Sequence, residues 1–487
     1  MLRLRPALAV LAVLAAGPSS TARAEEPPAQ APDAGQPSPS TLERAGEHFG
    51  RYVPVKPADP AACTTSTECA NRLGYGEVCV DGRCQEYVDS TDIFTMLHMS
   101  KAGHITPEPF VLYPSIVPAV GYNPALGFLI GVTAFLNMYL GDPETTTISS
   151  AQPVFLYTSL NQIVIQLVTT LMTADNSWEL QGDYRFLIYN QDTYGLGTGP
   201  TPVSGGFTLG GYGQTAAVPG AQPMNWNLLR FHQSVLKKVI GPLYLGGLFR
   251  FDRYYVVDDL DLNLSASPPV VTSHYAYSRY YSFNSNQYNV SSIGAQVLYD
   301  SRDSTVNPYR GVYADFWFKG NATWLGSSQN ATQVYTEFRT YIGLDDAIPR
   351  NVLAFWFIGQ GVTSGNVPYM ALPAIGWDAR GRTGRGYIAG RWRGTGMLYF
   401  ESELRFRITD DGFLGGVVFA NASTFTRPAV SITGYSDPGE HFFQFIRPAG
   451  GVGLRFMMNR TSRTNVTVDF SFSQTGFGLY LGAGEAF

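Results

Sequence analysis

Charged residues are scarce in this chain. Only 15% of its 487 residues are Asp, Glu, Lys or Arg, whereas 14% are aromatic. Soluble globular domains contain about 25% charged residues, so this composition is unusual. It excludes an intrinsically disordered chain, a coiled coil and a collagen-like fibre. The net charge of −5 shows no basic excess, so we expect no nucleic-acid partner.

Long apolar runs are also missing. Beyond the N-terminal segment, no uninterrupted apolar stretch approaches the ~20 residues that a membrane-spanning helix needs. The N-terminal segment has the three parts of a secretory signal peptide: Arg3 and Arg5, an apolar core over 7–17, and the small-x-small cleavage site at 22–24. Its apolar core is too short for a membrane anchor. Residues 1–24 therefore predict an exported protein.

Cysteine is absent after position 84. The four cysteines are Cys63, Cys69, Cys79 and Cys84, with the spacing C-x5-C-x9-C-x4-C. In an exported chain, an even number of cysteines in a short polar segment predicts disulfides, with three pairings open. A zinc site would need closer ligand pairs, usually C-x2–4-C. We therefore predict two disulfides over 63–84 and no metal site.

Two other segments flank the cysteines. Residues 25–62 are rich in Pro, Ala and Ser and bury too little apolar surface to order themselves, so they predict a linker. Residues 85–104 predict a connector, in which the apolar spacing over 89–103 favours a short amphipathic helix.

From residue 105 to the end, apolar and polar residues alternate with the period of a strand. In one stretch, Phe400 and Leu404 alternate with Glu401, Glu403 and Arg405. A soluble β-sandwich also alternates, but a purely apolar face opposite a face of paired charges is typical of a transmembrane barrel. Open edges are not tolerated in lipid, so the strands must close. Residues 105–487, at roughly 24 residues per strand and connection, predict an all-β, antiparallel transmembrane β-barrel of about 16 strands.

The last residues follow the same alternation. Phe477, Leu479 and Leu481 share their parity with Phe487. We therefore predict that Phe487 ends the closing strand and is a C-terminal signal for the barrel assembly machinery.

Four groups of residues resemble the bacterial surface-antigen superfamily of outer-membrane barrels, of the BamA and TamA type. The first group is similar to the opening strand, the second to a D-x-R-x-x-x-x-P-x-x-G turn, the third to an R-G-F/Y loop, and the fourth to the ending. The groups are 118–124 with Gly127 and Gly131; Asp300, Arg302, Pro308 and Gly311; Arg385, Gly386, Tyr387, Arg391 and Arg393; and 453–487. The resemblance covers about 105–487.

The resemblance implies that the loop around Arg385 folds into the barrel lumen. Arg385 would pair there with Glu403, or with Glu401 in its place. Asn421 stands where the family has an aspartate, and it keeps a hydrogen-bond acceptor without the charge. Read without the resemblance, the arginines of this loop suit the phosphates of lipopolysaccharide, or simply a solvated loop.

A role in outer-membrane assembly or translocation through a plugged barrel is what the resemblance implies. Family members that handle client proteins carry POTRA repeats of roughly 75 residues each, whereas 25–104 here predict only linker, cysteine segment and connector. A passive or gated porin and a structural surface antigen without transport are the alternatives.

No catalytic spacing such as G-x-S-x-G or H-E-x-x-H occurs, so we expect no enzyme and no cofactor. The expected partners are outer-membrane lipid, lipopolysaccharide, the barrel assembly machinery during biogenesis, and an unidentified periplasmic protein.

Overall fold

The computed structural model describes residues 62–73, 76–87, 89, 91–96, 108–123, 127–200, 220–267, 269–432, 435–460 and 462–487. The predicted signal peptide and all but the last residue of the predicted linker lie outside this range. None of the helices in the described residues has the length and apolar character that a membrane-crossing helix needs.

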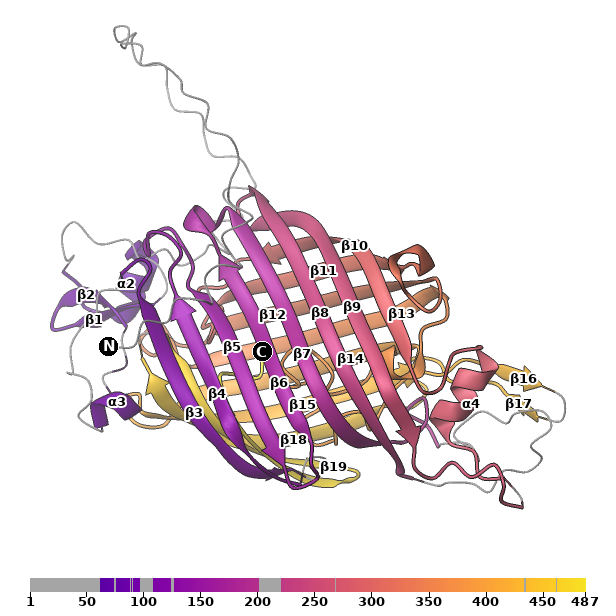
Figure 1. Cartoon of the computed structure of the whole chain (residues 1–487). Coiled ribbons are helices and arrows are strands. Elements are labelled where there is room, and N and C mark those ends of the chain that lie inside the picture. Colours follow the sequence, from indigo (N-terminus) through magenta and orange to yellow (C-terminus); the bar gives the residue numbers. More distant parts are fainter. Residues whose placement is uncertain are drawn as a thin grey trace, which may run out of the picture. The chain divides into compact units, whose positions relative to one another are not determined.

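A single antiparallel sheet of 16 strands forms the main body of the protein (Figure 1). Its strands are β3 Leu112–Asn123, β4 Gly127–Met138, β5 Ser149–Thr158, β6 Ile163–Met172, β7 Trp178–Thr193, β8 Gln222–Ile240, β9 Leu243–Asp259, β10 Tyr288–Asp300, β11 Gly311–Asn321, β12 Ala331–Gly343, β13 Val352–Gly365, β14 Gly396–Arg407, β15 Leu414–Thr426, β18 Arg447–Asn459, β19 Thr464–Ser473 and β20 Gly476–Ala483. Each strand pairs with its neighbour in sequence, except that β15 pairs with β18. The hairpin of β16 Val430–Ile432 and β17 Tyr435–Asp437 lies in the connection between them. The predicted fold class and strand number are confirmed.

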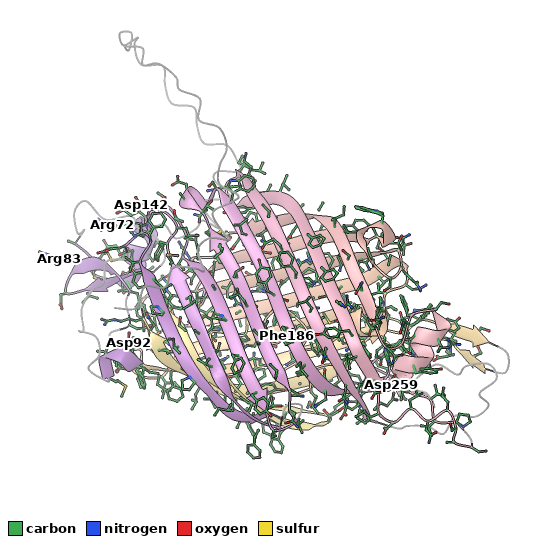
Figure 2. The ribbon with its side chains drawn as sticks, viewed as in Figure 1. Arg72, Arg83, Asp92, Asp142, Phe186 and Asp259 are labelled. Carbon is green, nitrogen blue, oxygen red and sulfur yellow. A yellow bond between two sulfur atoms is a disulfide. The ribbon has the colours of Figure 1, made fainter. Side chains whose placement is uncertain are left out.

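The sheet is apolar outside and charged inside. On β14, Phe400 and Leu404 are 46% and 42% exposed, whereas Glu401 and Glu403 between them are fully buried. The same inversion of the usual burial pattern recurs along the other strands, whose outward side chains are drawn in Figure 2. Such an inversion is stable only where lipid covers the outer face and the lumen solvates or pairs the charges.

The sheet forms a nearly closed barrel. β3 and β20 are the two ends of the hydrogen-bonded order and lie next to each other. In the described residues, no backbone register joins β3 to β20, unlike every other pair of neighbours. We call the end of the barrel where the chain enters β3 and leaves β20 the tail end, and the opposite end the loop end.

The longest connections of the barrel lie at the loop end. The α4 helix (Ser273–Tyr280) lies in the connection between β9 and β10, and the short helix η5 (Tyr369–Ala371) lies between β13 and β14. The short helix η4 (Thr323–Leu325) also lies at the loop end, whereas η2 (Ala174–Asn176) lies at the tail end, between β6 and β7. We call residues 366–395, between β13 and β14, the lumen loop.

Before β3, the cysteine segment forms a small unit of its own. It consists of α2 (Ser66–Leu73) and the hairpin of β1 (Glu77–Val80) and β2 (Arg83–Glu86). Disulfides join Cys63 to Cys79 and Cys69 to Cys84, which confirms the prediction of two bonds and resolves the pairing that the sequence left open. In the described residues before β3, no unit of the POTRA kind is present.

The connector makes only one turn of helix where the structure describes it. Helix α3 covers Ile93–Met96, so the predicted helix over 89–103 is shorter within the described residues, and 97–107 lie outside them. Asp92 directly precedes α3, and its carboxylate accepts a hydrogen bond from the Thr95 backbone N–H at 2.7 Å. Asp89 lies 3.5 Å from Arg350 in the turn between β12 and β13, so the connector is held against the tail end of the barrel.

Candidate functional site

The lumen loop folds into the barrel instead of extending from it. Its side chains Ile375, Tyr387 and Trp392 are 1%, 3% and 4% exposed and pack against inward-facing residues of β12 to β15. Gly386 has φ +111°, and a Cβ at this position would lie 2.8 Å from the Ala449 side chain on β18. Only glycine combines this backbone conformation with so close an approach to the barrel wall.

Arg385 lies at the centre of a buried ion-pair network. Its guanidinium is 2% exposed and contacts the carboxylates of Glu401 and Glu403 on β14. It also donates a hydrogen bond to Asp469 on β19 at 2.7 Å. Asn421 on β15 donates from Nδ2 to the backbone carbonyl of Arg385 at 2.9 Å, so the amide holds the loop backbone and not the guanidinium.

Two further arginines extend this network toward the end of the chain. Arg405 donates to Glu403 at 2.7 Å, and Arg455 on β18 donates to Asp469 at 2.5 Å and to Glu485 at 2.7 Å. We call the seven residues the Arg385 network: Arg385, Arg405, Arg455, Glu401, Glu403, Asp469 and Glu485. Three positive charges thus face four negative ones, and the nearby Arg382 of the lumen loop contributes a fourth positive charge.

The sequence alone predicted no partner for Asp469, Arg455 or Glu485. All three lie within 453–487, the fourth group of residues that resembles the surface-antigen barrels. Asp469 lies 84 positions from Arg385, and its only local signal is the polar parity that it shares with Thr467 and Ser471. Alternation shows that such a residue faces the lumen, but it does not show which partner it meets there.

The other arginines of the R-G-Y motif anchor different parts of the lumen loop. Arg393 donates to the backbone carbonyls of Tyr369 and Met370 at 3.1 and 3.0 Å. The Arg391 guanidinium lies 4.3 Å from the ring centre of Tyr194. In the part of the chain that the structure describes, neither arginine forms an ion pair. The Tyr387 hydroxyl donates to the Pro448 carbonyl on β18 at 2.7 Å.

The predicted signature turn lies at the tail end, between β10 and β11. Arg302 donates to both oxygens of Asp300, at 3.0 and 2.9 Å, and both side chains are buried. Gly311 has φ +108°, and a Cβ there would lie 2.4 Å from the Ser301 carbonyl oxygen, so the turn requires glycine. Pro308 lies in the same turn. This turn does not join the Arg385 network; Arg302 lies instead beside the Tyr313 ring, at 4.5 Å.

Phe487 does not end the closing strand, so that prediction is wrong. β20 ends at Ala483, and Gly484 with φ +76° turns the chain into the lumen. Phe487 is only 2% exposed, and its ring lies 5.1 Å from that of Trp356. Its carbonyl oxygen accepts a hydrogen bond from Arg405 at 3.0 Å. The alternation of β20 does not predict which way Phe487 points, because the strand conformation ends four residues earlier, at Ala483.

At the loop end, a buried hydrogen-bonded series holds α4. Asp259 lies 2.7 Å from His274 Nδ1, and His274 Nε2 lies 3.5 Å from Ser278. The order resembles a Ser-His-Asp triad, but His274 and Ser278 are fully buried, so a substrate does not reach the hydroxyl in this state. These hydrogen bonds hold α4 in place. Tyr277, on the same helix, donates a hydrogen bond to the Val367 carbonyl at 2.8 Å and so fixes the start of the lumen loop.

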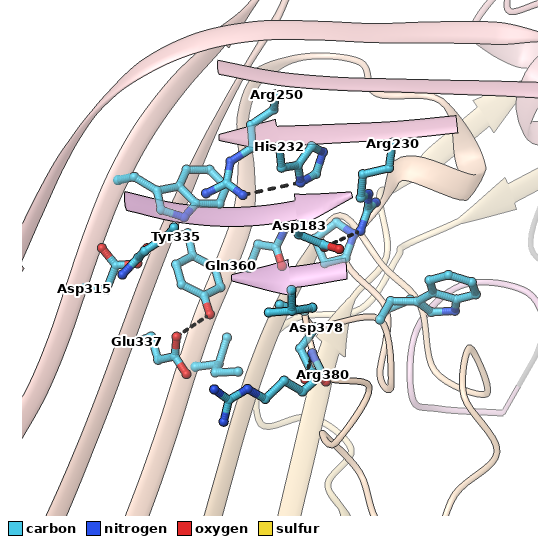
Figure 3. Close-up of a pocket in the computed structure, with 18 of the residues that line it drawn as sticks. Asp183, Arg230, His232, Arg250, Asp315, Tyr335, Glu337, Gln360, Asp378 and Arg380 are labelled. Carbon is cyan, nitrogen blue, oxygen red and sulfur yellow. Dashed lines mark hydrogen bonds and ion pairs between the residues drawn. The ribbon is translucent and has the colours of Figure 1, made fainter. Parts of the chain in front are cut away.

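A cavity remains between the lumen loop and the barrel wall. Its volume is about 260 Å³, and it is lined by residues of β6 to β9 and β11 to β14, by Arg302, by the lumen loop and by Ala486 (Figure 3). None of the seven residues of the Arg385 network is among its lining residues. The lumen therefore contains two separate polar regions, one filled by ion pairs and one open to small molecules.

Comparison with known proteins gives one family match and several matches among solved structures. The Omp85 superfamily domain matches residues 259–487. BamA from Haemophilus ducreyi lacking POTRA domains 1–3 matches with 14% identity and a TM-score of 0.45, over 91% of this chain and 78% of that one. CdiB from Acinetobacter baumannii matches with 11% identity and a TM-score of 0.41, over 77% of this chain and 59% of that one. CdiB from Escherichia coli matches with 10% identity and a TM-score of 0.43, over 78% and 62%.

No curated protein matches the chain in sequence. The match to the Omp85 superfamily includes the signature turn, the lumen loop and every residue of the Arg385 network. The predicted relationship to surface-antigen barrels is confirmed by the match of the Omp85 superfamily domain to residues 259–487.

Proposed function

We propose that this protein works in outer-membrane assembly or translocation, as a barrel whose lumen is plugged by the lumen loop. The observation that carries the proposal is the attachment of Arg385 to three buried carboxylates on β14 and β19. Removing one partner from a buried ion pair costs about 3–5 kcal/mol, so these contacts hold the loop firmly inside. The Omp85 superfamily domain supports a place in the outer membrane.

The plug favours this role over that of a passive porin. A porin keeps a water-filled channel through its lumen, whereas the lumen loop here brings Tyr369, Ile375 and Trp392 into the barrel as buried side chains. A barrel closed in this way passes a substrate only when the loop moves, which suits controlled passage.

The seam between β3 and β20 supports a role in membrane insertion. Edge strands present unpaired N–H and C=O groups, onto which a strand of another protein can add. In the described residues, β3 and β20 are the two strands of the barrel with such an edge. Under the proposal, the seam faces lipid and offers this edge to a client strand.

Conductance in planar bilayers tests the plug. We expect low, flickering conductance from the full chain, and larger, steadier conductance from Arg385→Ala and from a variant whose residues 374–392 are replaced by a short Gly-Ser linker. The control is Arg253→Ala, because Arg253 is exposed on the outer face of β9. A long-lived open pore in the unmodified protein would favour the porin instead.

Deletion in the native host tests the cellular role. We expect loss of the chain to change the outer-membrane protein profile or the set of exported proteins, and we expect the unmodified chain, but not the loop-replacement variant, to restore it. Unchanged permeability together with an unchanged outer-membrane profile would support a structural surface antigen and contradict the proposal.

A further inference from the structure

The seam between β3 and β20 lacks the backbone hydrogen bonds that join the other neighbouring strands in the described part of the barrel. On one side of the seam, β3 to β7 are paired without interruption and form one wall (Figure 1). Across the seam, a Cβ at Gly484 would lie 3.1 Å from the Phe135 ring of β4, so apolar packing bridges the tail end. Further contacts between the two sides come from the lumen loop.

The middle of the lumen loop is a compact unit. We call residues 376–384 the tip segment. The Asp378 carboxylate accepts hydrogen bonds from the backbone N–H groups of Arg382 at 3.0 Å and Thr383 at 2.8 Å. The Thr383 hydroxyl donates to the same carboxylate at 2.7 Å and accepts a hydrogen bond from the Gly376 N–H at 2.8 Å. A segment bonded to itself in this way moves as one piece.

One side of the tip segment is attached to β20. The Arg382 guanidinium donates a hydrogen bond to the Ala483 carbonyl oxygen at 3.0 Å. It also lies against Gly482, where a Cβ would be 2.6 Å from Nη2 of Arg382. Position 482 alternates with the outward-facing Leu481, so it faces the lumen. Because glycine leaves this place open, the guanidinium reaches the backbone of the strand.

The other side of the tip segment is attached to β6 and β7. Arg185 on β7 donates to the backbone carbonyls of Asp378 and Ala379, at 2.9 and 3.0 Å. Gln166 on β6 donates to the Ala379 carbonyl at 2.6 Å. An ion pair with Asp183 at 2.7 Å holds the Arg185 side chain in this orientation. These strands belong to the wall that begins at β3.

The tip segment therefore crosses the seam on the inside of the barrel. In the order of the sheet, β20 and β3 are the two ends, and β6 and β7 follow from β3. The hydrogen bonds of Arg382 lie on one side of the seam, and those of Arg185 and Gln166 lie on the other. If β20 moved away from β3, one of these two attachments would have to break.

The Arg385 network differs from the tip segment in this respect. Its partner residues lie on β14, β18 and β19 and in the residues after β20, all on one side of the seam. It consists of buried ion pairs, whereas the tip segment is held to the wall by hydrogen bonds to backbone carbonyls. Such hydrogen bonds contribute less than a buried ion pair costs to break. The tip segment can therefore release while Arg385 still holds the lumen loop.

We propose that the tip segment is an internal strap that keeps the seam closed. Arg382 fastens the strap to β20, and Arg185 with Gln166 fastens it to the wall that begins at β3. Release of either end frees the two strands to separate. The inference rests on the proposed function, in which the seam offers its edge to a client strand, and it names the residues that control this edge.

Distances between two spin labels, measured by pulsed electron paramagnetic resonance on the full chain in non-ionic detergent, test the strap. The labels are attached to Val132→Cys on β4 and Leu481→Cys on β20, which are outward-facing positions. All native cysteines are bonded, so only the introduced thiols react. Arg382→Gln and Arg185→Gln should each raise the ratio of long to short distances about fivefold, as expected for the loss of one ordinary hydrogen bond. The double variant should open no further, since a strap that is free at one end is already released.

Two controls accompany this measurement. Arg380→Gln removes a cation from the same tip segment, but the Arg380 side chain forms no hydrogen bond or ion pair with any described residue, so the distances should not change. A second label pair, Val132→Cys with Ile165→Cys on β6, lies on one side of the seam and should keep its distance in every variant. Heat-modifiable migration in gel electrophoresis verifies that each variant is folded.

Unchanged distances across the seam in the folded variants would overturn the strap. An equal change in Arg380→Gln, or additive opening in the double variant, would do so too. Gln166→Leu removes an uncharged fastening and keeps the test valid if Arg185→Gln fails to fold. Failure of the strap would leave the proposed function standing, because deletion in the native host does not depend on what holds the seam. Opening of the seam in the variants, with an unchanged outer-membrane profile after deletion, would contradict the proposed function and not the strap.

Discussion

Arg382 of the lumen loop donates a hydrogen bond to the backbone carbonyl oxygen of Ala483, the last residue of β20, at 3.0 Å. The plug is therefore attached directly to one of the two strands that border the seam. A second connection runs from Arg385 through Asp469 to Arg455 and on to Glu485, beyond the end of β20. Because of these contacts, a movement that separates β20 from its neighbours would also loosen the plug.

The first prediction concerns Arg385. Arg385→Ala removes the one cation that bonds Glu401, Glu403 and Asp469 together, so it should lower the free energy of unfolding by about 3–5 kcal/mol. Arg385→Lys should restore only part of this loss, because an ammonium does not provide the planar fork of a guanidinium. The measurement is urea unfolding in detergent, followed by intrinsic tryptophan fluorescence.

A double-mutant cycle serves as the control for Arg385. Arg385→Ala combined with Glu403→Gln should cost less than the sum of the two single changes, since the neutral amide relieves the uncompensated charge. Strict additivity would show that the two side chains do not depend on each other.

The second prediction separates two roles of Phe487. Phe487→Ala should lower stability by about 3–5 kcal/mol, because its buried ring packs on Trp356 and Tyr341. Phe487→Leu keeps most of the apolar volume and should lower stability less. If Phe487 is also an assembly signal, its deletion should reduce the barrel in the outer membrane and raise its degradation in the periplasm. Normal outer-membrane levels of the deletion variant would exclude the signal but not the packing role.

The third prediction is a pH dependence that comes from Glu485. Burial alone would raise the pKa of this carboxyl, but the guanidinium of Arg455, and after it that of Arg405, hold the pKa below its ordinary value of 4.5. The stabilisation is therefore fully present above about pH 4.5 and is lost as the pH falls from there through the lowered pKa. Glu485→Gln should flatten this part of the stability curve, as measured by urea midpoints at a series of pH values. An unchanged curve would mean that other carboxylates control acid unfolding.

The fourth prediction concerns the cysteine unit. All four cysteines are bonded, so mass spectrometry of alkylated, non-reduced protein should find no modified thiol over 63–84. Cys63→Ser with Cys79→Ser should leave one bond, Cys69 to Cys84. The barrel should keep its heat-modifiable migration, because neither disulfide reaches the strands of the main sheet. Loss of the folded barrel would show that the unit is needed for folding.

The barrel itself could be predicted because its cause is local. Alternation with period two places Phe400 and Leu404 on one face and Glu401 and Glu403 on the other, whatever the rest of the chain does. With closure required in lipid, this pattern and the length were enough for a barrel of 16 strands. The disulfides could also be predicted from cysteine number and export, but their pairing required the actual positions of α2 and the β1–β2 hairpin.

The partners of the lumen residues could not be predicted in this way. Asp469 and Glu485 meet Arg385 and Arg455 only because closing the sheet brings β14, β18 and β19 around the same part of the lumen, into which the lumen loop descends. Phe487 turns inward because the positive φ of Gly484 ends the strand. Beyond that residue, the alternation of β20 no longer determines which way a side chain points. The sequence by itself determined which side of the wall each strand residue faces, since this depends on neighbouring residues alone. Only the tertiary structure decided which inward residues pair, which carry unbalanced charge and where a cavity remains, since these depend on distances across the closed barrel.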